Sequence, residues 1–191
     1  QIGKITLYAT SEKGYKNLTK LSSLSYLKNK NPHDPCCEID DLILNNEDLI
    51  LLTGNYNDFF GKLFYANKTK YFEKIIKKLE SSFKDRLYIE IQRHAEIQEK
   101  NYENYLLKVS SLCNLPLIAG QEVYYLDSGM AEAHDALICI GEKQFIDDQN
   151  RFRYSNQHYL KKSEELKKLY KDIPEALENN YNFPLRFNFK P

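Results

Sequence analysis

Short apolar strands alternate with amphipathic helices along most of this chain, and that alternation constrains its fold more than any other feature. Runs with strand composition lie at residues 5–9, 48–53, 87–92 and 115–123. Helical patterns follow at residues 11–27, 58–65, 70–83, 98–113 and 130–140, with a short one near 39–43. This alternation is typical of a parallel sheet, either open or closed into a barrel. The sequence therefore predicts an α/β fold.

Two of these helices carry clear local signals. Ser11 can cap the first one, because its hydroxyl can accept a hydrogen bond from a free backbone N–H of the first turn. The helix at 70–83 has apolar residues along one face and many lysines on the other. The apolar face consists of Phe72, Ile75, Ile76, Leu79 and Phe83. We expect this face to pack in the core.

The pattern changes beyond Gly141. Asp147–Asn150 predicts a turn, and Arg151–Tyr154 combines basic and aromatic side chains. Capped helices are expected from Ser163 and from Pro174, since proline is favoured in the first helical turn.

Charge and hydropathy exclude two classes of partner. The 27 basic and 27 acidic residues cancel, so the chain lacks the basic surface that by itself drives nucleic-acid binding. No apolar run approaches the roughly 20 residues that cross a bilayer, and no signal peptide opens the chain. We therefore expect no membrane partner, no direct DNA binding by this chain alone, and a cytoplasmic location.

The four cysteines, Cys36, Cys37, Cys113 and Cys139, show neither CxxC spacing nor a disulfide framework. Cys113 and Cys139 lie in apolar surroundings and are expected in the core, because free cysteine is commonly buried. The chain begins with a glutamine and contains one methionine. We therefore expect a piece of a longer protein.

Glycine-rich phosphate loops and the Gly-x-Ser-x-Gly elbow are absent from the sequence. Four histidines remain as candidate metal ligands or acid–base groups. His33 and His158 lie in polar stretches and are expected at the surface. His134 lies near a helix start and is expected to have a structural role.

His94 is the most informative histidine, because it follows the strand that carries Glu90. The carboxyl ends of parallel strands gather at one edge of a sheet, and Glu122 lies at the end of the next strand. One imidazole and two carboxylates at this place have two interpretations. They are the remains of a divalent metal site, or they form a hydrogen-bonded polar cluster that fills the mouth of the fold.

Several stretches, taken in order, resemble the PHP (polymerase and histidinol phosphatase) domain of bacterial replicative DNA polymerase III alpha subunits. The stretches are Ile5–Ala9 with Gly14–Leu18, Leu49–Gly54, Leu87–His94, Leu115–Ala119, Ala133–Leu137, Asp147–Asp148 before Arg151–Arg153, and Asp172–Asn179. The resemblance implies a portion of a distorted (β/α)7 TIM-like barrel. It implies a PHP domain over residues 1–182 that lacks its first strands, and a linker over residues 183–191 toward a polymerase palm domain. A barrel without its first strands would expose two sheet edges.

Active members of this family hold up to three metals at the strand ends, and this chain departs from their pattern. His94 matches a family histidine, but Lys4 stands in place of a histidine, Glu122 in place of an aspartate, and Tyr124 in place of another histidine. A lysine repels a divalent cation and favours an ion pair with a carboxylate such as Glu122, and a phenol with a pKa near 10 is a poor ligand at neutral pH. We therefore expect a silent site without a metal, in which restoring one histidine does not restore activity.

The resemblance implies that the parent protein is a DNA-directed DNA polymerase, a nucleotidyltransferase of DNA replication that uses DNA, deoxynucleotides and palm-bound Mg²⁺. In this interpretation the chain has no catalytic residue or cofactor of its own. It supports the other polymerase domains and docks the epsilon proofreading exonuclease and the replicase holoenzyme. The alternatives are an active PHP phosphoesterase or proofreading nuclease with Glu90, His94 and Glu122 as ligands, and a free-standing phosphatase.

Overall fold

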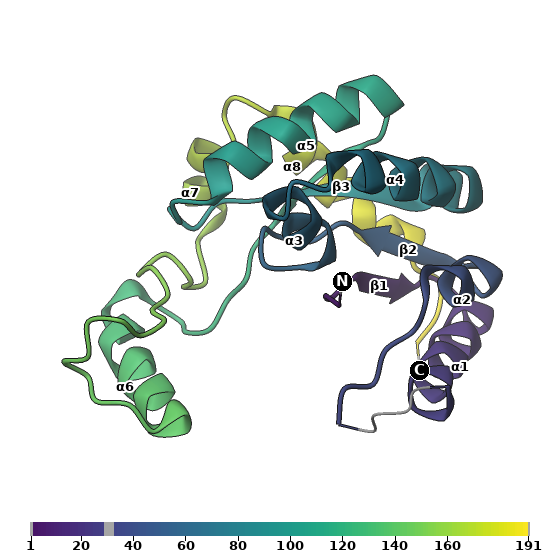
Figure 1. The fold of residues 1–191 in the computed structure, drawn as a ribbon. Coiled ribbons are helices and arrows are strands. Elements are labelled where there is room, and N and C mark those ends of the chain that lie inside the picture. The colour runs from purple at the N-terminus through teal and green to yellow at the C-terminus, as the bar shows by residue number, and fades with distance from the viewer. Residues whose placement is uncertain (1, 29–32, 191) are drawn as a thin grey trace.

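The computed structural model of the chain describes residues 2–28 and 33–190 and shows a mixed α/β fold (Figure 1). Its four-stranded sheet has the order β1-β2-β3-β4. The strands are β1 (Thr6–Ala9), β2 (Leu49–Leu52), β3 (Leu87–Gln92) and β4 (Leu117–Gly120). β2, β3 and β4 are parallel, as predicted, whereas β1 runs antiparallel to β2. The α/β class is therefore confirmed, and a fully parallel sheet is not.

The antiparallel pairing of β1 follows from how the chain returns to the sheet. α1 (Glu12–Leu27) and α2 (Ile39–Leu44) lie between β1 and β2. They bring the start of β2 back to the end of β1, where the Thr10 N–H donates to the Asp48 carbonyl at 2.9 Å. Ser11 caps α1 as predicted, because its hydroxyl accepts the N–H of Gly14 at 3.1 Å. The same hydroxyl donates to the Asp48 carboxylate at 2.6 Å.

The main core lies between the sheet and the helices that cross between its parallel strands. α3 (Phe59–Tyr65), α4 (Thr69–Phe83) and a 3-10 turn (Lys84–Arg86) connect β2 to β3, and α5 (Glu99–Cys113) connects β3 to β4. Figure 1 shows α4 and α5 on the same side of the sheet. The predicted apolar face of α4 is confirmed, because all five of its residues are buried. This packing fixes β3 and β4 side by side and positions the loops at their ends.

The other face of the sheet is covered by the C-terminal segment. Ile50, Leu52, Tyr88 and Ile118 form a second buried cluster on this face. Phe183 and Phe187 pack against it from a 3-10 turn, Phe183–Arg186. Phe183 and Phe187 thus lie on the sheet, and the role of residues 183–191 as a linker to a palm domain stays a prediction.

The chain after β4 adds helices. A 3-10 turn (Ser128–Met130) and α6 (Ala131–Glu142) come first, followed by α7 (Ser163–Leu169) and α8 (Pro174–Asn182). α8 covers the free edge of β4, because the Asn180 amide exchanges two hydrogen bonds of 2.8 and 2.7 Å with the backbone of Ala119. β4 is also shorter than the predicted strand. The described ranges therefore contain an open sheet and no closed barrel, since side chains of α8 take the place of a fifth strand beside β4.

The burial of one histidine and two cysteines can be compared with the predictions. His33 is exposed, as predicted, and Cys139 is buried, but Cys113 is only half-buried at the end of α5. Within residues 2–28 and 33–190, every helix is too short or too polar to cross a bilayer.

Candidate functional site

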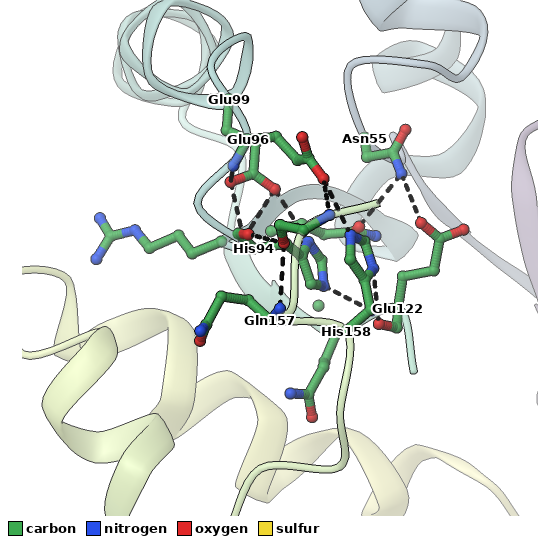
Figure 2. A network of polar contacts seen from close by, with 12 residues as sticks. Asn55, His94, Glu96, Glu99, Glu122, Gln157 and His158 are labelled. Atoms are coloured by element: carbon green, nitrogen blue, oxygen red, sulfur yellow. Dashed lines mark hydrogen bonds and ion pairs between the residues drawn. The ribbon is translucent and has the colours of Figure 1, made fainter. Parts of the chain in front are cut away.

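Polar side chains gather where β2, β3 and β4 end. The parallel strands bring their carboxyl ends to one edge of the sheet, and the antiparallel β1 brings its start, with Lys4, to the same edge. The loops after the strands supply Asn55, His94 and Glu122, and a later segment supplies His158 (Figure 2). His94 and Glu122 meet here, as their places after neighbouring strands predict.

His94 is buried and both of its ring nitrogens are engaged by protein groups. Nδ1 lies 2.9 Å from the carboxylate of Glu99, and Nε2 accepts the backbone N–H of Glu122 at 3.0 Å. Because Nε2 accepts a hydrogen bond, the ring proton lies on Nδ1 and is donated to Glu99. The same carboxylate accepts the backbone N–H of His94 at 2.8 Å. Glu99 thus fixes the orientation and the tautomer of the ring.

His158 is buried beside His94, so the prediction that it lies at the surface was wrong. The two imidazoles are stacked with centroids 4.1 Å apart and an interplanar angle of 3°. The polar sequence around His158 does not reveal that this segment pairs with the loop after β4. Tyr124 donates its N–H to the His158 carbonyl at 2.9 Å, and Leu160 donates to the Tyr125 carbonyl at 3.0 Å. Burial, followed by the neighbouring His94 ring, lowers the pKa of His158.

Glu96 and Ser155 hold this second segment in place, and sequence reasoning missed both. The Glu96 carboxylate accepts the N–H of Ser155 at 2.8 Å and lies 3.4 Å from Nε2 of His158. The Ser155 hydroxyl donates to the carbonyl of His94. Glu99 and Asn55 were missed as well. The only signal available in the sequence was the closeness of Glu96 and Glu99 to the end of β3.

The side chain of Glu122 borders an open cleft. A cleft of about 340 Å³ is lined by Lys4, Asn55, Asn57, Asp58, Lys62, Glu122, Tyr124, Phe152 and Tyr154. The Asn55 amide donates to the Glu122 carboxylate at 3.3 Å. Lys4 lies at the same cleft, but no ion pair joins it to Glu122 in the described part of the chain. The expected ion pair between these residues is therefore replaced by the contact with Asn55.

Glu90 is buried on β3, near the same edge of the sheet. Its carboxylate accepts the side-chain amide of Gln92 at 2.7 Å. Gly120 leaves room for it, since a Cβ at that position would lie 2.0 Å from Oε1 of Glu90. Burial raises the pKa of Glu90, and the Gln92 hydrogen bond partly offsets this effect. The alternation of β3 is confirmed, because Leu87, Ile89 and Ile91 lie in the main core and Glu90 does not.

Tyr124 forms an aromatic cluster at the rim of the cleft. Its ring stacks on His134 with centroids 5.1 Å apart, and it also contacts Tyr154 and His158. Its hydroxyl donates to the Tyr154 hydroxyl at 3.1 Å. Burial, followed by hydrogen bonds with Tyr154 and Glu122, raises the pKa of Tyr124. Tyr124 is therefore a protonated phenol at neutral pH, and His134 has the packing role that was expected of it.

The arginine that precedes His94 connects this site to the C-terminal helices. Arg93 donates to both carboxylate oxygens of Glu103, at 2.9 and 2.6 Å, and to both of Asp172, at 2.7 Å each. Its guanidinium also lies over the ring of Tyr170. These contacts hold β3, α5 and the start of α8 together.

The possible donors at this edge do not converge on one point. Within residues 2–28 and 33–190, no group of three or more histidine, cysteine, aspartate or glutamate side chains is arranged to hold a single metal ion. The arrangement is instead a hydrogen-bonded cluster next to a polar cleft.

Comparison with known families and proteins gives a consistent result. The PHP domain family matches residues 1–94, about half of the chain, and the match ends at His94. The DNA polymerase III subunit alpha of Caulobacter vibrioides is 34% identical over 185 residues, and that of Rickettsia bellii is 35% identical over 186 residues. The Escherichia coli protein of the same name is 31% identical over 189 residues. These alignments cover 97 to 98% of this chain but only 16% of each relative.

Proposed function

The chain belongs among the PHP-domain sequences of bacterial DNA polymerase III alpha subunits, and we propose that it serves such a polymerase as a structural module without a catalytic metal. The parent protein would be a DNA-directed DNA polymerase of cytoplasmic chromosome replication. Its DNA and deoxynucleotide substrates, and Mg²⁺, would be bound by a palm domain outside this sequence. The open sheet would then be part of a larger barrel of the PHP type.

The proposed partners follow from the same relationship. Other domains of the alpha subunit would pack on this module, and the epsilon exonuclease and further holoenzyme subunits would dock on it. The span of 16% of each relative supports this division of labour, since most of such a protein lies elsewhere in its chain.

The observation that carries the proposal is the hydrogen bonding of His94. A histidine binds a metal through an unprotonated ring nitrogen. Nδ1 of His94 donates its proton to Glu99, and the lone pair of Nε2 is directed at the N–H of Glu122. Both nitrogens are occupied, so a metal at this ring would first have to displace a protein hydrogen bond.

Two further side chains at the cleft fit a divalent metal poorly. Tyr124 keeps its phenolic proton at neutral pH, because burial and the hydroxyl of Tyr154 raise its pKa. Lys4 adds a positive charge to the lining of the same cleft, which disfavours a second cation nearby. The residues at this edge therefore support a site in which hydrogen bonds replace metal coordination.

The rival proposal, a working PHP phosphoesterase or nuclease, is favoured by one specific observation. Burial raises the pKa of both Asp58 and Glu90, and the charge of Glu122 contributes to both increases. Carboxyl groups with raised pKa values beside a cleft are common in active sites. A cation drawn into this cluster would favour the ionised forms of both carboxyl groups.

The proposal is tested by measuring the metal content of the complete polypeptide and its rate of phosphodiester hydrolysis. We expect elemental analysis to find no stoichiometric manganese, zinc or iron, and a generic phosphodiester substrate to remain intact with Mn²⁺ or Zn²⁺ added. Primer extension by the same preparation should proceed normally, and this assay tests separately whether the parent protein is a DNA polymerase.

His94→Ala is the deciding variant, and His33→Ala, at an exposed loop position, is its matched control. Stoichiometric metal together with turnover that His94→Ala abolishes and His33→Ala preserves would establish the phosphoesterase instead. Activity that survives His94→Ala would be assigned to a contaminating enzyme.

A further inference from the structure

α6 and the segment that follows it expose a group of large apolar side chains. Leu137 is 64% exposed, Ile140 75%, Phe145 80% and Ile146 50%. Leu137 and Ile140 are three residues apart and share one face of the helix. Large apolar side chains that gather on the surface of a folded protein mark an interaction site. We call these four residues the α6 patch.

The opposite face of α6 is firmly attached, so the α6 patch faces outward from an ordered element. His134 stacks on Tyr124, and Asp135 forms an ion pair with the buried Arg151. Cys139 is buried on the same side. The helix therefore presents one packed face and one open face.

The turn that carries Phe145 and Ile146 is organised by hydrogen bonds. The Phe145 N–H donates to the Asp148 carboxylate at 2.9 Å, and the Asp148 N–H returns to the Phe145 carbonyl at 3.1 Å. Arg153 donates to the carbonyl of Ile146 at 2.9 Å. The backbone that carries Phe145 and Ile146 is thus ordered by these hydrogen bonds, which lowers the entropy cost of binding a partner.

The surroundings of the α6 patch are acidic. Residues 126–153 contain six carboxylates, Asp127, Glu132, Asp135, Glu142, Asp147 and Asp148, against three basic side chains, Lys143, Arg151 and Arg153, so this part of the chain keeps an excess of negative charge. Of these six carboxylates, only Asp135 forms an ion pair with a described residue. Two such surfaces would repel each other, and so would this surface and a nucleic acid or an anionic membrane. Charge complementarity instead requires a partner whose apolar contact area is bordered by lysine and arginine.

We propose that the α6 patch is an interface with another domain of the same, longer polypeptide, whose contacting surface is apolar with a basic rim. This inference rests on the proposed function. The relatives are about six times longer than this chain, which covers 16% of them, so a large share of covalently attached surface lies outside residues 1–191. An attached domain binds at high effective concentration and needs no second molecule. Figure 1 shows that α6 lies on the side away from α1 and the C-terminus, and the exposure of its apolar side chains leaves them accessible to such a contact.

The test measures the reactivity of a single cysteine in the complete polypeptide. Phe145→Cys places a thiol in the α6 patch, in a tryptic peptide that lacks Cys139, so mass spectrometry follows its maleimide labelling separately. Ile97→Cys is the matched control, because Ile97 is 91% exposed and lies outside the patch. We expect residue 145 to label about tenfold more slowly than residue 97 in the complete protein alone, because the interface must open before the reagent reaches it.

Each other outcome overturns the proposal. Fast labelling of residue 145 in the complete protein, alone and with its partner subunits, would mean that the patch stays free. If residue 145 labels fast in the complete protein by itself but slowly once a second subunit is added, the patch binds that subunit. Slow labelling that becomes fast on dilution would show a contact between two copies.

Charge reversal tests the basic rim separately. Glu142→Lys together with Asp147→Lys should speed the labelling of residue 145 in the folded complete protein by more than in the same protein unfolded in denaturant, where the added charges activate the thiol without an interface, and should leave residue 97 unchanged. An unchanged rate at residue 145 would contradict a basic contact surface. Primer extension by the Phe145→Cys protein reports the polymerase assignment independently, so a failure of that assignment is distinguishable from a failure of the interface.

Discussion

The backbone N–H of Glu122 donates to Nε2 of His94 across 3.0 Å, and so joins the loop after β4 to the end of β3. This contact assigns the ring proton to Nδ1, where Glu99 accepts it at 2.9 Å. His158 stacks on the same ring and donates from Nδ1 to the Glu122 carbonyl at 3.2 Å. One peptide segment thus makes contacts with two stacked histidines. The imidazole of His94 acts here as a connection between loops.

His94→Ala should destabilise the protein by about 2 kcal/mol, since it leaves the half-buried Glu122 N–H without its acceptor and removes one donor to the buried Glu99. The measurement is denaturant unfolding of the transition that contains this domain. His33→Ala, at an exposed position, should change the same free energy little. Equal stability of His94→Ala and the unmodified protein would show that the connection is not structural.

Glu90→Gln should stabilise the protein, and more so at pH 7 than near pH 4.5. Burial raises the folded-state pKa of Glu90 above its ordinary value of 4.5. The folded state therefore binds more protons than the unfolded state between the two pKa values, and stability falls as the pH rises through that interval. The amide keeps an acceptor for Gln92 and carries no charge, so this fall should become smaller.

The measurement for Glu90→Gln is the unfolding free energy as a function of pH. Glu178→Gln, at an exposed position on α8, should leave the curve nearly unchanged. A curve for Glu90→Gln that parallels that of the unmodified protein would mean that Glu90 is solvated in the folded state.

The sequence predicts the helices and strands well because their signals are local. The apolar face of α4 and the Ser11 cap of α1 each depend on residues within a few positions of one another, and both are confirmed. The order of neighbouring strands also brought His94 and Glu122 together. Patterns within a single element were therefore sufficient for most of the fold.

The features that the sequence did not predict depend on contacts between distant residues. His158 is surrounded by polar residues but is buried, since its segment pairs with residues 124–125, more than 30 positions earlier. β1 is antiparallel because Thr10 meets Asp48, and β4 ends at Gly120 because its pairing with β3 ends there, at Gln92. Neither helical nor strand periodicity contains this information.

Arg93→Lys should destabilise the protein by about 1 to 2 kcal/mol, because an ammonium cannot reproduce the paired hydrogen bonds to Glu103 and Asp172. Lys167→Ala, in an exposed pair with Glu164, should have little effect. The measurement is again denaturant unfolding, with the double variant Arg93→Lys and Asp172→Asn added. If the two changes act through one contact, their combined effect should be smaller than the sum of the single effects.

Tyr124→His should not create a metal site, even though it restores an imidazole at the rim of the cleft. The new ring would still lie beside Lys4, and His94 would still direct its Nε2 lone pair at the Glu122 N–H. Elemental analysis after incubation with Mn²⁺ or Zn²⁺ should show no stoichiometric metal, and phosphodiester hydrolysis should stay at background. Tyr124→Phe is the matched control, because it loses the hydroxyl and keeps the ring that stacks on His134. Metal binding by Tyr124→His but not by Tyr124→Phe would mean that one missing ligand alone had silenced the site, and would contradict the hydrogen-bonded cluster proposed for this edge of the sheet.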